Sequence, residues 1–207
     1  VHHPPLSMDY KLVTIILAAG ESRRMGRPKL FLPVKDTTLL RHAVDAAVTV
    51  NPEGEVIVVT GAYDTQIREH LSPHETILFT YCRSWREGMS NSLSLGVTAG
   101  WMFQPTHYLV TLADQPTVDG AALRMLRTES ETYPEQIVAT QYPERLGVPA
   151  IFPASFVKEL RDKSGQWGAR KLIARQGDNV RAIAFPTPPI DIDTPEDYDR
   201  FLKSAGK

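Results

Sequence analysis

The chain has 207 residues, of which 42% are hydrophobic and 23% are charged, and its formal net charge is -1. This composition excludes a disordered chain, and the near-neutral charge argues against broad nucleic-acid binding. Cys82 is the only cysteine, so an internal disulfide and a cysteine-cluster zinc site are excluded. No apolar run approaches the roughly 18 residues that suggest a membrane span. We therefore expect a globular protein in a reducing compartment, the cytoplasm.

The first residues lack the basic and apolar regions of a signal peptide. We interpret residues 1–9 as a disordered leader or a non-native remnant, with Met8 as an alternative start. Residues 10–204 are expected to form one domain, since their number is usual for a single domain.

Apolar runs typical of strands alternate along the chain with segments of helical spacing. In chain order we expect strand 11–19, helix 38–50, strand 55–60, helix 65–71, strand 76–80, helix 90–103, strand 107–113, helix 119–131, strands 136–140 and 149–152, helices 154–161 and 168–176, strand 179–185 and helix 195–202. Asp119 is the expected N-cap of its helix. Strands that are apolar on both faces indicate a parallel sheet covered on both sides. The predicted fold is α/β, a three-layer α/β/α sandwich around a mostly parallel, Rossmann-like sheet.

Ligands of such folds bind where loops gather at the carboxyl ends of the strands. The loop after the first expected strand, 20–29, combines two glycines with four cations, Arg23, Arg24, Arg27 and Lys29. Its spacing excludes a Walker A loop and a dinucleotide fingerprint. The loop is either an anion site or a basic, solvated turn, and the crowding of four cations favours the anion site.

Carboxylates follow two other expected strands. Asp114, in T-L-A-D-Q-P, is placed to hold Mg²⁺ against phosphate oxygens, or it begins a turn before Pro116. Asp191 and Asp193, in D-I-D-T-P, alternate, so on extended backbone they point the same way. One of them could complete a metal shell, whereas Asp193 or Thr194 could instead cap the last helix.

The run L-A-A-G-E-S-R-R-M-G-R-P-K resembles the signature of the MobA-like NTP transferases of the molybdenum-cofactor type. The resemblance implies that the base and phosphates are framed by Leu17, Ala18, Ala19 and Gly20. It also implies that Arg24 and Lys29 bind the triphosphate. Fixed cations there would neutralise the charge that develops during attack on the α-phosphorus.

The same resemblance extends to the carboxylates. The family's A-D-Q-P carries an Asp that binds the metal, which makes Asp114 the expected Mg²⁺ ligand. D-I-D-T-P-E-D also matches the family residue for residue. We favour Asp191 as the second metal ligand and a structural role for Asp193.

The segment W-R-E-G-M-S-N-S-L is similar to one that closes over the nucleotide in the family. Gly88, Met89 and Ser90 are therefore expected nucleotide contacts, because free N–H groups at a helix start could read a base edge or phosphate. An N-cap role for Ser90 is the structural alternative.

The acceptor-binding residues that the resemblance implies are Gly147, Pro149 and Arg170. This side of the site departs from the family pattern, since Leu146 replaces an Arg, Val148 a frequent His or Asn, and Gln166 an Asp. These departures put a molybdopterin acceptor in doubt. Arg170 either contacts an acceptor phosphate or pairs with a carboxylate as a structural bridge.

The resemblance implies a Mg²⁺-dependent nucleotidyltransferase with Arg24, Lys29 and Asp114 as its catalytic residues. Such an enzyme transfers a nucleoside monophosphate from a nucleoside triphosphate to a phosphate-bearing acceptor, here a pterin cofactor of the molybdopterin type, and releases pyrophosphate. No general base is required, since a phosphate monoester is already ionised near neutral pH. Ala19 resembles the cytidylyl branch, so CTP is the expected donor.

Three alternatives remain open. One is a relative that uses GTP or another acceptor. Another is a non-catalytic nucleotide-binding chaperone for a molybdoenzyme, against which Asp114 and Asp191 argue, because a binder needs no complete metal site. The third, a nicotinamide-dependent reductase, lacks the glycine fingerprint. No nucleic-acid or membrane partner is expected.

Overall fold

A seven-stranded sheet lies at the centre of the computed structural model, which describes residues 10–72, 77–164 and 168–205. Its strands are β1 (Leu12–Ala18), β4 (Glu55–Thr60), β5 (Ile77–Tyr81), β6 (His107–Leu112), β7 (Ile137–Tyr142), β8 (Arg145–Pro153) and β9 (Val180–Ile183). They lie in the order β5-β4-β1-β6-β8-β7-β9. Only β8 runs antiparallel to its neighbours, β6 and β7, so the prediction of a mostly parallel sheet is confirmed.

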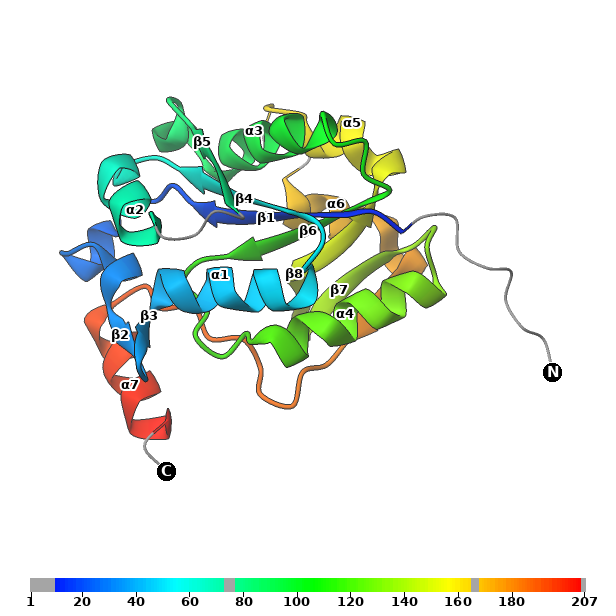
Figure 1. Cartoon of the computed structure of the whole chain (residues 1–207). Coiled ribbons are helices and arrows are strands. Elements are labelled where there is room, and N and C mark those ends of the chain that lie inside the picture. The colour runs from blue at the N-terminus through cyan, green and yellow to red at the C-terminus, as the bar shows by residue number, and fades with distance from the viewer. Residues whose placement is uncertain (1–9, 73–76, 165–167, 206–207) are drawn as a thin grey trace.

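Helices cover both faces of this sheet (Figure 1). One face carries α3 (Met89–Trp101), α5 (Val157–Leu160) and α6 (Ala169–Gln176). The other carries α1 (Leu39–Val50), α2 (Asp64–Leu71) and α4 (Gly120–Thr132). The predicted three-layer sandwich is therefore confirmed. No helix in the described part of the chain is both long and apolar enough to span a membrane.

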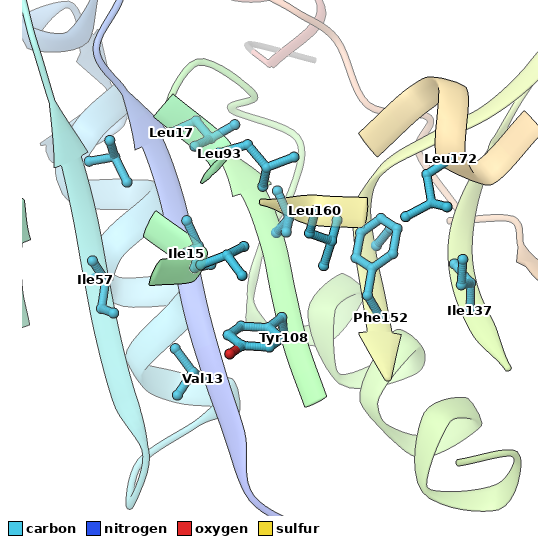
Figure 2. Packing of buried hydrophobic residues seen from close by; sticks show 14 of the residues in the cluster. Val13, Ile15, Leu17, Ile57, Leu93, Tyr108, Ile137, Phe152, Leu160 and Leu172 are labelled. Carbon is cyan, nitrogen blue, oxygen red and sulfur yellow. The ribbon is translucent and has the colours of Figure 1, made fainter. Parts of the chain in front are cut away.

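The core beneath α3, α5 and α6 extends along the sheet from β4 to β7. Figure 2 shows Ile15 of β1, Leu93 of α3 and Phe152 of β8 pointing into this layer. Strand residues alternate between the two faces, so the neighbour of Ile15, Ile16, packs under α1 instead. A strand that is buried on both faces must be apolar throughout, which is why β1 reads as a continuous apolar run.

A small subdomain is attached at the carboxyl end of the sheet. The two-stranded hairpin β2 (Pro33–Val34) and β3 (Thr37–Thr38) packs with α7 (Pro195–Ala205). The Tyr198 hydroxyl of α7 donates to the Pro33 carbonyl oxygen at 2.7 Å. This packing brings the loop after β1 next to the segment that precedes α7.

Most predicted boundaries lie within three residues of those observed. Asp119 caps α4 as expected, because its side chain accepts from the Ala122 N–H at 2.9 Å. The strand predicted at 149–152 is longer in the structure, because β8 starts at Arg145 and forms a hairpin with β7. The predicted helix 154–161 is a 3₁₀ turn followed by the single turn of α5. Thr76, the predicted start of one strand, lies outside the described residues.

The strand order places a switch point between β1 and β6. The chain moves from β1 outward to β4 and β5, and then returns to form β6 on the other side of β1. In a doubly wound sheet, the loops at such a point diverge and leave a crevice for a ligand. The loops after β1 and β6 carry the cations and Asp114, so the topology brings these groups together.

Helix α3 approaches the sheet closely because two glycines face it. A Cβ atom at Gly96 would lie 2.6 Å from Cγ2 of Ile15 and 2.8 Å from Cγ2 of Val59. A Cβ at Gly100 would meet Cγ1 of Val13 at 2.9 Å. These contacts are shorter than packed carbon atoms allow, so the helix can lie at this depth only with glycine there.

A Gly96→Val variant is therefore expected to fold with reduced stability. Overpacking a well-filled core costs about 1–3 kcal/mol, which lowers Tm by about 2–12 °C in a chain of this size. Thermal unfolding of the variant against wild type measures the effect. Thr98→Val is the matched control, because Thr98 is exposed on the same helix. Equal Tm values for both variants would contradict this account of the packing.

Candidate active site

A cavity of about 320 Å³ opens at the carboxyl ends of β1 and β6. Six of its lining residues come from the end of β1 and the following loop and were predicted to bind nucleotide, namely Leu17, Ala18, Ala19, Gly20, Arg24 and Lys29. Met89 and Asp114, also predicted, line the same cavity. The structure thus brings the basic loop and the carboxylate after β6 to one cavity.

Local turns fold the basic loop back on itself. Ser22 has φ 57° and begins a 3₁₀ turn over Arg23–Met25, which Gly26 ends at φ 71°. The Ser22 hydroxyl then accepts from the Lys29 N–H at 3.3 Å, and the Tyr63 hydroxyl donates to the Glu21 carbonyl oxygen at 2.8 Å. These bonds fix the loop, so that Lys29 returns to the cavity beside the residues that end β1.

Two cations and two carboxylates form an ion-pair network in the cavity. Lys29 Nζ lies 2.6 Å from Asp114 Oδ2 and 2.9 Å from Asp193 Oδ1. Arg24 Nη2 lies 2.9 Å from the other oxygen of Asp193, Oδ2. Lys29 is nearly enclosed, with 12% of its side chain exposed, whereas 69% of Arg24 is exposed. Both cations line the cavity, together with Asp114 and Asp193.

Burial and ion pairing act against each other on the central pair. Burial raises the pKa of Asp114, although the ammonium of Lys29 opposes the change, while Asp191 and Asp193 add to it. Burial disfavours the charged form of Lys29, but Asp114 and Asp193 together outweigh it, and its pKa rises. Lys29 is therefore a fixed positive charge near neutral pH.

The segment before α7 is tied to the end of β6 by its backbone. The Ile192 N–H donates to the Asp114 carbonyl oxygen at 3.0 Å, and the Ile192 side chain is fully buried. Asp193 then reaches Lys29 and Arg24, whereas Asp191 Oδ1 accepts from Gln115 Nε2 at 2.7 Å. Asp193, expected to be structural, thus lines the cavity, whereas Asp191, the expected second metal ligand, is not among the lining residues.

These donors fit a divalent cation such as Mg²⁺. Asp114 Oδ1 is buried and has no hydrogen-bond partner among the described residues, which is unusual for a carboxylate oxygen. Across residues 10–72, 77–164 and 168–205, no three His, Cys, Asp or Glu side chains converge on one point. Mg²⁺ commonly binds through one or two carboxylates and takes its remaining ligands from phosphates and water. An ion at Asp114 would therefore depend on the nucleotide for completion.

The segment before α3 places one of its three predicted contacts in the cavity. Met89 lines the cavity and is 62% exposed, but Gly88 and Ser90 do not line it. The structural alternative for Ser90 is wrong, because α3 starts at Met89 and Gly88, with φ 128°, occupies the N-cap position. Trp85 and Ser92 also line the cavity. Both occur in the quoted motif, but the sequence did not reveal which way their side chains point.

The predicted acceptor-binding residues lie outside the cavity lining. Gly147 and Pro149 belong to β8, and Arg170 lies in the first turn of α6. Leu146 packs against the core under α5 and α6. Gln166, a departure from the family pattern, lies outside the described residues.

A basic loop and a buried carboxylate that meet at the switch point of an α/β sheet fit a nucleotide-binding transferase. The chain belongs to the MobA-like NTP transferase family, whose domain model matches residues 14–180. The chain is thus a nucleotidyltransferase that acts on a nucleoside triphosphate, and the predicted family membership is confirmed.

Named relatives align over most of the chain. Purine catabolism protein PucB of Bacillus subtilis (strain 168) is 27% identical over 91% of this chain and 94% of its own length. The molybdenum cofactor cytidylyltransferase of Escherichia coli (strain K12) is 25% identical over 89% of this chain and 92% of its own length.

Solved structures agree with this assignment. Rv0371c of Mycobacterium tuberculosis H37Rv superposes with a TM-score of 0.77, at 29% identity over 93% of this chain and 98% of that one. A second Rv0371c structure, a complex with manganese, has a TM-score of 0.72 at 26% identity over 94% and 99% of the two chains.

Proposed function

We propose that this protein transfers CMP from CTP to the phosphate group of an acceptor and releases pyrophosphate. The acceptor in this proposal is a pterin cofactor of the molybdopterin type, the divalent ion is Mg²⁺, and the compartment is the cytoplasm. The observation that carries the proposal is the Lys29–Asp114 pair, whose carboxylate keeps one buried oxygen without a partner at the cavity. The similarity to a molybdenum cofactor cytidylyltransferase supports the donor and the acceptor.

The chain's own side chains account for most of the chemistry. Arg24 and Lys29 exchange Asp193 for the triphosphate, and their charges stabilise the oxygens that become more negative as pyrophosphate leaves. Mg²⁺ held by Asp114 and Asp191 would supply further charge neutralisation on the phosphates. The acceptor phosphate is already ionised near neutral pH, so positioning and charge neutralisation suffice without a general base.

The wall of the cavity supports a pyrimidine donor. Ala19 lines the cavity, and its methyl group lies 2.8 Å from the position that a Cβ of Gly61 would take. A Cβ there would also lie 2.9 Å from Cγ of Trp85, so Ala19, Gly61 and Trp85 form one closely packed wall. Ala19, which gives the chain the L-A-A-G that resembles the cytidylyl branch, therefore occupies a fixed position in this wall and supports CTP as the donor.

A thermal-shift panel with CTP, GTP, ATP and UTP, each with and without Mg²⁺, tests the donor. A ligand at about 100 times its Kd stabilises a protein by about 2.7 kcal/mol, which corresponds to a Tm rise of about 5–10 °C here. We expect this shift with CTP and Mg²⁺ and a much smaller one with CTP alone. Pyrophosphate release on addition of molybdopterin cofactor then tests the acceptor.

The other outcomes of this panel are distinct. A larger shift with GTP would retain the mechanism and overturn the choice of base. A CTP shift without pyrophosphate release on addition of the cofactor would overturn the choice of acceptor, in line with Leu146 and Val148. No shift with any nucleotide would contradict the catalytic proposal and favour a maturation chaperone.

A further inference from the structure

A chain of hydrogen bonds links the cavity to the hairpin of β7 and β8. Gln115 Nε2 donates to Asp191 Oδ1 at 2.7 Å and to the Tyr142 hydroxyl at 2.9 Å. The Tyr142 hydroxyl in turn donates to the Val148 carbonyl oxygen at 2.6 Å. Gln115 is only 2% exposed, so the chain is buried at its centre. The hairpin is therefore held at a fixed position relative to the segment that carries Asp191.

Arg145 lies at the outer end of this hydrogen-bond chain. It pairs with Tyr142 across the hairpin, and its guanidinium carbon lies 4.5 Å from the centroid of the Tyr142 ring. Stacking on an aromatic face holds a guanidinium flat and leaves its N–H groups free to bind another group. In the described part of the chain, no carboxylate forms an ion pair with Arg145.

Gly147 provides the space in which Arg145 lies. A Cβ at Gly147 would lie 2.9 Å from Nη1 of Arg145 and 3.1 Å from Cε2 of Tyr142. Any larger residue would push the guanidinium off the ring. The adjacent residue Leu146 faces the opposite side and packs into the core. The hairpin thus presents one oriented cation next to Tyr142.

The hydrogen bonds from Gln115 to Tyr142 and Asp191, together with the stacking of Arg145 on Tyr142, place this cation near Asp191. Burial, with a smaller contribution from the charges of Asp191 and Asp114, raises the pKa of Tyr142 to about 12, although the Gln115 hydrogen bond and Arg145 oppose the change. Tyr142 is therefore within electrostatic reach of both the carboxylates and Arg145.

We propose that Arg145, held by Tyr142 and Gly147, binds the phosphate group of the second substrate and so determines its class as a phosphate monoester. This inference rests on the proposed function, since it assigns the acceptor side of that same site. The planar guanidinium can donate two parallel hydrogen bonds to phosphate oxygens. The Gln115 chain fixes the distance between this phosphate and the site of the α-phosphorus, which in-line attack requires.

Titration of inorganic phosphate and of a pterin phosphate monoester into protein saturated with CTP and Mg²⁺ tests the proposal. In Arg145→Met, loss of charge-assisted hydrogen bonds is expected to raise both Kd values by about 10- to 100-fold. The thermal shift with CTP and Mg²⁺ should not change. Arg124→Met, at an exposed position of α4, is the matched control and should bind both probes as wild type does.

Gly147→Ala tests the positioning separately, because it keeps the charge. Its added methyl mainly displaces the far end of the flexible Arg145 side chain, with a lesser contact at the edge of the Tyr142 ring, so we expect a folded protein with weakened phosphate binding. Wild-type affinity of Arg145→Met for both probes, or no binding of either probe to wild type, would overturn the proposal. If CTP does not bind, the proposed function fails, but the same titration of nucleotide-free wild type and Arg145→Met still tests Arg145.

Discussion

Replacing Asp114 with asparagine is expected to lower kcat/KM by about 10³-fold while the protein stays folded. The substitution preserves the size of the side chain but removes the charge that pairs with Lys29 at 2.6 Å. It also removes the partnerless carboxylate oxygen that would bind the divalent ion. Loss of electrostatic stabilisation at a reacting phosphate typically costs about 10²–10³ in rate, and loss of the ion adds to it. Initial rates of pyrophosphate release measure the change.

Although its activity falls, the Asp114→Asn protein is expected to be at least as stable as wild type. Burial raises the pKa of Asp114, so the folded protein holds this proton more tightly than the unfolded chain does. The ionised carboxylate therefore opposes folding at neutral pH, and its penalty disappears as the pH falls through the folded-state pKa. Lys29 keeps Asp193 as a counter-ion at 2.9 Å, so without nucleotide the Tm of Asp114→Asn should equal or exceed that of wild type.

Asp119→Asn is the control for this experiment. Asp119 caps α4 away from the cavity, and asparagine caps a helix about as well as aspartate. Its activity and Tm should match wild type. An Asp114→Asn enzyme that retains more than a tenth of wild-type kcat/KM would show that Asp114 is not essential for the reaction.

Local sequence signals were sufficient for the parts of the site that lie within one segment. The run before Ala19 is apolar throughout because β1 is buried on both faces, and such runs identify central strands. The glycines and cations that follow identified the basic loop. Asp114 could be placed at a strand end for the same reason. The cavity gathers these residues because the switch point between β1 and β6 follows from the strand order.

Contacts between distant segments could not be predicted in the same way. The position of Asp193 depends on the hydrogen bond from Ile192 to the Asp114 carbonyl oxygen, which no local pattern encodes. The antiparallel direction of β8 could not be predicted either, because an apolar run does not specify parallel or antiparallel pairing. The stacking of Arg145 on Tyr142 depends on that direction. The acceptor side of the site was therefore the least predictable part.

A Lys29→Met variant is expected to lose both activity and stability. Methionine retains the unbranched apolar stem of lysine but leaves Asp114 buried without a counter-ion. Removing one partner of a buried ion pair typically costs about 3–5 kcal/mol, which lowers Tm by about 6–20 °C in a chain of this size. Loss of the cation on the triphosphate should also reduce kcat/KM by about 10²–10³-fold. Thermal unfolding and pyrophosphate release measure the two effects separately.

The double variant Lys29→Met/Asp114→Asn distinguishes these two roles of Lys29. Removing both charges eliminates the unpaired buried carboxylate, so most of the lost stability should return. Activity should not return, because neither the cation nor the carboxylate is present to bind phosphate and metal. Restored stability without activity would mean that the pair is kept for its chemistry rather than for folding. If the double variant is as unstable as Lys29→Met, the instability arises from lost packing around position 29 and not from the unpaired charge.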